Sequence, residues 1–161
     1  MEYFELFNKL AQHKVRYLIC GGLAVNIYGI PRMTADIDIL LDFTEENLER
    51  FETAIKIIKY QSMLPIAIKT FVSAKARQKM INEKNLIAYS YFNTFANYMN
   101  LDVLIDVPLI FEEMWNSREI RKIEDLQVNL VSVEDLIKLK QYANRKQDND
   151  DIILLSKLIK K

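Results

Sequence analysis

The sequence predicts an α/β (α+β) fold, in which a mixed, twisted sheet is flanked by helices and followed by a helical C-terminal segment. β-rich runs alternate with helical segments along the chain, a pattern typical of α/β proteins. The run VRYLIC ends directly in Gly21-Gly22, and a short helical run, LAVNIYGI, follows. A further apolar run, TADIDILLD, carries the carboxylate pair Asp36 and Asp38.

Length and composition are those of one globular domain. The chain has 161 residues, 50% of them hydrophobic and 27% charged, which allows one core and is too short for two. We expect a single domain over residues 1–161, with a sheet-containing core (1–131) and C-terminal helices (132–161). Basic and acidic residues balance at 22 each, whereas a non-specific nucleic-acid binder is usually basic.

The sequence also indicates a compartment. A single cysteine fits a reducing environment. The N-terminal run MEYFELFNKLAQ carries acids, so we do not expect a signal peptide, and no stretch approaches the length of a membrane span. We therefore expect a cytoplasmic protein without membrane contact.

The first elements follow from periodicity. Tyr3 to His13 has apolar residues at helical spacing, and His13 near its end is suited to a cap or a surface position. Val15 to Cys20 is the first strand, and we expect Cys20 to pack as a small apolar side chain.

TADIDILLD is the second strand, and its alternation separates apolar from acidic side chains. Asp36, Asp38 and Leu40 share one face, because successive strand residues point to opposite sides. Two carboxylates on an apolar strand repel each other and lose solvation. A hard divalent cation with oxygen ligands compensates both effects.

The strand, the Gly21-Gly22 turn and the helix start form a concavity of backbone N–H groups, which suits phosphate. Glycine allows a ligand to approach the backbone closely. Arg32 and Thr34 precede the carboxylates and are placed to reach phosphate oxygens.

These residues resemble a known family. The patterns G-G-x-A and G-x-x-R-x-T-x-D-I-D are similar to the nucleotidyltransferase superfamily, with its polymerase-beta-like fold, and most of all to small bacterial members related to abortive-infection toxins. The resemblance implies that Gly21 and Gly22 hold a triphosphate and that Asp36 and Asp38 bind magnesium. It also implies a third metal carboxylate on a later strand.

The middle of the chain reads as two helices. Thr44 starts the first, which we expect to run to about Tyr60, and the second follows Pro65 and runs to Lys84. The second helix is basic, with Lys69, Lys75, Arg77 and Lys79. We favour a solvated face, and the alternative is a basic ridge that contacts an acidic or nucleic-acid substrate.

Three strands are expected after this helix. Leu86 to Phe95 places Tyr89 and Tyr91 on one face, where aromatic residues usually pack; a stacking platform for a base is the alternative. Asn100 to Val107 carries Asp102 and Asp106 on one face, and the resemblance assigns the third metal carboxylate to Asp102. A loop and short helix through PLIFEEMWNSREI lead to a last strand, Gln127 to Val131.

The C-terminal run S-x-E-D-L-I-x-L-K-x-x-A-x-R-x-x-D-x-x-D also resembles that family. Ser132 caps its helix, and Lys140 lies at the edge of the apolar stripe, from which its charge can extend into a cleft. The resemblance places this helix at the triphosphate pocket, so Lys140 and Arg145 are nucleotide-binding candidates. The alternative is that both side chains are only solvated or pair with the acids at Asp148 to Asp151. A final helix begins with the acids near Asp148, and Gln147 replaces a lysine of the family pattern.

The predicted activity is transfer of a nucleoside monophosphate from NTP to a hydroxyl or similar acceptor, with two Mg²⁺ ions held by Asp36, Asp38 and Asp102. A non-catalytic, antitoxin-like interaction module with the same fold is the alternative. A metal-dependent phosphohydrolase is disfavoured, because one histidine cannot supply a histidine-rich metal site. RNA, a protein or a small molecule remain open as acceptor, and a toxin or antitoxin partner is expected from the resemblance.

Overall fold

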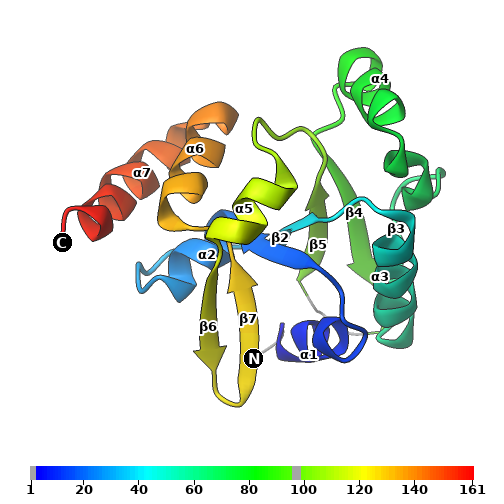
Figure 1. The fold of residues 1–161 in the computed structure, drawn as a ribbon, viewed down its shortest axis with the longest axis horizontal. Coiled ribbons are helices and arrows are strands. Elements are labelled where there is room, and N and C mark those ends of the chain that lie inside the picture. The colour runs from blue at the N-terminus through cyan, green and yellow to red at the C-terminus, as the bar shows by residue number, and fades with distance from the viewer. Residues whose placement is uncertain (1–2, 96–98) are drawn as a thin grey trace.

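The computed structural model describes residues 3–95 and 99–161, which form a seven-stranded mixed sheet with helices on both faces (Figure 1). The strands are β1 (Tyr17–Cys20), β2 (Asp36–Leu41), β3 (Tyr60–Ser62), β4 (Ala88–Asn93), β5 (Asn100–Leu104), β6 (Glu119–Ile123) and β7 (Leu126–Leu130). Their order across the sheet is β3-β4-β5-β2-β1-β7-β6. This confirms the predicted fold class.

Seven α-helices and one 3-10 helix are described. They are α1 (Phe4–Gln12), α2 (Gly21–Ile27), α3 (Glu45–Ile57), η1 (Ile68–Val72), α4 (Ala74–Lys84), α5 (Phe111–Ser117), α6 (Val133–Ala143) and α7 (Lys146–Ile159). His13 is the C-cap residue of α1, and Ser132 caps α6 by accepting a hydrogen bond from the Asp135 amide, both as expected. No helix among the described residues has the length and apolar character needed to cross a bilayer.

The centre of the sheet fixes the register of the acidic strands. β2 runs antiparallel to β1 and parallel to β5, so that Asp38 lies opposite both Cys20 and Asp102. Directly opposed residues on neighbouring strands point to the same face. The two strands on which the sequence placed carboxylates are therefore neighbours in the sheet.

The opposite face of β2 is the core. Ile37 and Ile39 are fully buried there, and Phe7 of α1 stacks on Tyr17 of β1. Tyr89 and Tyr91 belong to the same face and are only 2% and 4% exposed. They pack against other aromatic rings, including Phe51. The packing interpretation of these tyrosines is therefore correct, and a base-stacking platform does not form there.

Two strands differ from the prediction. α3 ends at Ile57, and Lys59 adopts a positive φ of 67° before β3 begins at Tyr60, so the predicted helix is too long. Glu119–Ile123 forms β6, an edge strand paired with β7, where a loop and short helix were expected. Most of its side chains are polar, because an edge strand needs to bury little surface. The alternation of apolar and polar residues that predicts a strand is therefore missing.

The basic segment after Pro65 is divided into η1 and α4, because Ser73 ends the first and caps the second. α4 buries none of its residues. Lys75 and Lys79 are exposed, as expected for a solvated face. Arg77 differs, because its guanidinium donates to the Phe71 carbonyl and lies 4.9 Å from the centre of the Phe43 ring.

Candidate active site

Three carboxylates gather on one face of the two central parallel strands. Asp36 and Asp38 lie two residues apart on β2, and Asp102 on β5 is the register partner of Asp38. Neighbouring strands are about 4.8 Å apart, which leaves these side chains within reach of one another. The structure thus brings together the carboxylates that the sequence singled out.

The pKa values of two of these carboxylates indicate that too little positive charge surrounds them. Burial and then the Asp102 carboxylate raise the pKa of Asp38 to about 6, although Arg145 and Lys140 act in the opposite direction. The same two causes raise the pKa of Asp36. Crowded carboxylates with raised pKa values gain most from a nearby cation.

Within the described residues, no three His, Cys, Asp or Glu side chains already converge in the geometry of a bound metal ion. The donor set itself suits Mg²⁺, because oxygen ligands on one face of adjacent strands are what a hard divalent cation prefers. Mutual repulsion keeps uncompensated carboxylates apart, and a cation between them removes that cost. We therefore judge that Asp36, Asp38 and Asp102 fit the metal.

The glycine pair is required by close packing against these strands. Gly21 has a φ of +61°, and a Cβ there would lie 2.0 Å from Oδ2 of Asp38. A Cβ on Gly22 would lie 2.8 Å from Oγ1 of Thr34 and 3.5 Å from Cζ of Arg32. The predicted Gly21-Gly22 turn is in fact the start of α2, and it lies close to three of the predicted site residues.

The cations predicted for the nucleotide site meet two acids of α7. Lys140 lies 3.2 Å from Oδ1 of Asp148 and 2.8 Å from Oδ2 of Asp151. Arg145 pairs with Asp148 at 2.9 Å, and Arg32 pairs with Asp151. Spacing of three residues places both acids on one face of α7.

Lys140 is not at the exposed edge of the apolar stripe, as the sequence suggested. It is 3% exposed, and Asp148 is completely buried. Burial alone would raise the pKa of Asp148, but hydrogen bonds from Arg145 and Lys140 outweigh it and lower the pKa. The lysine is therefore part of a buried ion-pair network as well as of the cleft wall.

A cleft of about 430 Å³ joins these elements. Its lining includes Gly21, Asp38, Lys140 and Arg145, with Cys20 at its base. Cys20 is fully buried, as predicted, and burial raises its pKa, so it packs as an apolar residue. The volume is within the range of small-molecule sites.

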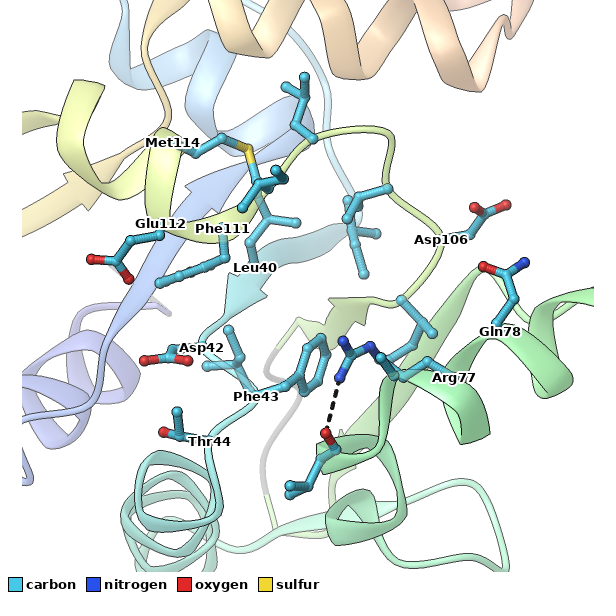
Figure 2. Close-up of a pocket in the computed structure, with 18 of the residues that line it drawn as sticks. Leu40, Asp42, Phe43, Thr44, Arg77, Gln78, Asp106, Phe111, Glu112 and Met114 are labelled. Atoms are coloured by element: carbon cyan, nitrogen blue, oxygen red, sulfur yellow. Dashed lines mark hydrogen bonds between the residues drawn. The ribbon is translucent and has the colours of Figure 1, made fainter.

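A second cavity of about 560 Å³ adjoins this cleft. Both are lined by Leu104, Asp106 and Val107, at the end of β5. Figure 2 shows the second cavity between α4 and α5, with Asp106 on its wall and Arg77 beside Phe43. The two cavities therefore share this part of their walls.

Asp148, Asp151 and Tyr142 were not predicted as site residues from the sequence. The D-x-x-D spacing was a usable signal for the first two, because it pairs them on one helix face. Tyr142 carried no signal, since its hydrogen bond to Asp106 joins residues 36 positions apart. Gln147, where the resembled family has a lysine, is exposed.

Comparison with known proteins gives a matching family and a similar fold. A family model described as nucleotidyl transferase AbiEii toxin, Type IV TA system, matches residues 6–151. No curated protein matches the chain. The fold is similar to the lincomycin-bound lincosamide antibiotic adenylyltransferase LnuA, at 16% identity, with 96% of this chain and 94% of that chain covered and a TM-score of 0.61.

It is also similar to ANT(2")-Ia in complex with adenylyl-2"-tobramycin, at 13% identity, with 96% and 86% of the two chains covered and a TM-score of 0.59. A solution structure of ANT(2'')-Ia gives 13% identity, 98% and 82% coverage and a TM-score of 0.61. At these identities the likeness concerns the fold.

Proposed function

The chain belongs to the AbiEii family of nucleotidyltransferase toxins of type IV toxin–antitoxin systems, and on this premise we propose how its residues carry out the transfer of a nucleoside monophosphate. The NTP lies in the cleft between the Gly21-Gly22 turn and α6. The acceptor hydroxyl approaches from the neighbouring cavity, past Asp106. This approach of the acceptor is supported by the wall that the two cavities share.

Asp36, Asp38 and Asp102 hold Mg²⁺, with two ions expected. The metal would supply positive charge where the attacking and leaving oxygens carry negative charge. The carboxylates project from two adjacent strands of the sheet, which keeps all three close to the same point of its face.

The phosphates are oriented by the backbone of the glycine turn and by cations. Gly21 and Gly22 lack a Cβ, which lets a phosphate approach their amides. Thr34 lies against Gly22, and its hydroxyl donates to the Asp36 carbonyl at 3.1 Å. Three cations keep N–H donors that the α7 acids do not use: Arg32, Lys140 and Arg145. Their positive charges neutralise the pyrophosphate as it leaves.

The remaining assignments follow from the family. A type IV system implies an antitoxin as partner, and a toxin of this kind acts in the cytoplasm. The acceptor is a hydroxyl of RNA, a protein or a small molecule. The antitoxin-like alternative has less support, because the matching family consists of toxins.

The observation that carries the proposal is the crowding of Asp38 between Gly21 and Asp102, beside a cation-lined cleft. Thermal unfolding with and without Mg²⁺ and each NTP tests it. We expect the pair of ligands to raise Tm by several degrees in the wild type and to have no effect in Asp38→Asn. An equal shift in both proteins would place the nucleotide elsewhere.

A further inference from the structure

One hydroxyl is already present in the cleft. Among the described residues that line it, Tyr142 alone has a hydroxyl side chain, and it shares this lining with Gly21 and Asp38. Tyr142 lies in the last turns of α6, two residues before the C-cap Asn144, and is 52% exposed. An acceptor hydroxyl is the one reactant of the transfer that neither the sequence nor the comparisons identify.

The hydroxyl of Tyr142 is paired with a carboxylate. Its Oη donates to Oδ1 of Asp106 at 2.7 Å. Asp106 follows β5 and lies on the wall that the nucleotide cleft shares with the neighbouring cavity. A hydroxyl within hydrogen-bond distance of a carboxylate is the arrangement of a nucleophile with its general base.

We propose that Tyr142 is a self-acceptor, to which the protein transfers a nucleoside monophosphate from a bound NTP. This inference rests on the proposed function. The Tyr142 oxygen forms a bond to the α-phosphorus. The bond from that phosphorus to the oxygen that bridges the α- and β-phosphates breaks, and pyrophosphate leaves. The phenolic proton passes to the Asp106 carboxylate and then to solvent. The product is a tyrosyl nucleotide phosphodiester on the chain itself.

The hydrogen bond to Asp106 raises the pKa of Tyr142, so the phenol keeps its proton at neutral pH, and the Asp106 carboxylate is the base placed to take it at the moment of attack. Two further features of the surroundings favour the reaction. The end of a helix opens more readily than its middle, which gives the ring freedom to turn. An acceptor on the same chain also avoids the entropic cost of bringing in a second molecule.

The competing interpretation is that the hydrogen bond only ties α6 to the loop after β5. Intact-protein mass spectrometry separates the two. The purified full-length chain is incubated with Mg²⁺ and ATP, GTP, CTP or UTP, and labelled peptides are sequenced. We expect a mass increase of one nucleoside monophosphate, located on Tyr142. The first-order rate is expected not to change with protein concentration, since the transfer is within one chain.

Three variants test the roles. Tyr142→Phe removes the acceptor oxygen and is expected to abolish the mass increase. Asp106→Asn can still accept the hydrogen bond but cannot take the proton, so labelling of Tyr142 is expected to slow by about 10²-fold or more. Tyr28→Phe is the matched control, because the Tyr28 hydroxyl donates to the Val131 carbonyl away from the cleft. In this variant, labelling of Tyr142 is expected to persist.

The outcomes distinguish this inference from the proposed function. If the wild-type protein labels a component of a cell lysate but never itself, self-transfer is wrong and the proposed function stands. Labelling that survives in Tyr142→Phe also overturns it. If neither the lysate nor the chain is labelled with any of the four nucleotides, both proposals fail.

Discussion

Asp38 lies between the start of α2 and the carboxylate of the neighbouring strand. Its carboxylate faces Asp102 across the parallel ladder and fills the space that a side chain on Gly21 would occupy. In the metal-free protein this position is unfavourable for a negative charge, which is why its pKa is raised to about 6. Function and stability are therefore opposed at this one side chain.

Replacing Asp38 by Asn is expected to stabilise the metal-free protein. The folded state binds a proton on Asp38 up to about pH 6, whereas an unfolded aspartate loses it near about pH 4. The folded state thus holds more protons between these values, and Asp38 makes the wild type less stable as pH rises through this interval.

Urea unfolding in the presence of a chelator measures this effect. The advantage of Asp38→Asn is expected to reach about 1–2 kcal/mol at pH 8, after allowance for solvent screening, and to disappear near pH 4. A variant that is less stable than the wild type at pH 8 would show that the carboxylate is already compensated without metal.

Gly21→Ala is expected to harm both stability and transfer. The change forces a side chain into a left-handed conformation and drives its Cβ into the Asp38 carboxylate. Gly29→Ala is the matched control, since Gly29 has a φ of +92° but no neighbour within 4 Å. The backbone strain is about 1–3 kcal/mol in each, and only Gly21→Ala is expected to lose transfer. Equal transfer rates in the two variants would contradict close packing at Gly21.

At the scale of elements, two acids of α7 hold the candidate cations of the site. Asp148 and Asp151 hold Lys140 from α6 and Arg32 from the segment before β2, so α7 positions charge at the cleft without lining it. Periodicity predicted both helices. It did not reveal the burial of Lys140, because partners eight and eleven residues away on another helix are invisible to the helical pattern.

Lys140→Ala is expected to destabilise the protein, whereas the loss of a lysine from the surface would have little effect. The variant leaves Asp148 and Asp151 buried with less compensation, at a cost of about 3–5 kcal/mol. Lys138→Ala, on the same helix, removes an exposed lysine from its pair with Asp135, which keeps its hydrogen bond from Ser117, and is expected to cost less than about 1 kcal/mol. Chemical denaturation compares them, and similar losses would show that the network contributes little.

The two acids of the β5 segment are expected to differ in transfer. Asp102 pairs in register with Asp38, whereas Asp106 lies beyond the end of the strand. Asp102→Ala is therefore expected to abolish transfer to acceptors in a lysate, and Asp106→Ala to retain part of it. The reverse ranking in an assay with Mg²⁺ and labelled NTP would mean that Asp106 is the metal ligand.

At the scale of the whole molecule, the site is assembled from segments far apart in the sequence. The fold class, the acidic strands and the glycine turn were predictable, because each is a local pattern of alternation or conformational need. Strand order, the edge strand Glu119–Ile123 and the Tyr142–Asp106 hydrogen bond were not, since they depend on pairing between distant segments. The sequence therefore reveals the candidate site residues on local patterns better than those that meet through tertiary packing.

The central claim is that Asp36, Asp38 and Asp102 support nucleotidyl transfer to an acceptor. Incubation of a cell lysate with NTPs labelled at the α-phosphate, Mg²⁺ and either the wild-type protein or Asp38→Asn tests it most directly. We predict that the wild type labels at least one species with at least one nucleotide, and that the folded variant labels none. Labelling by Asp38→Asn at the wild-type rate would contradict the account.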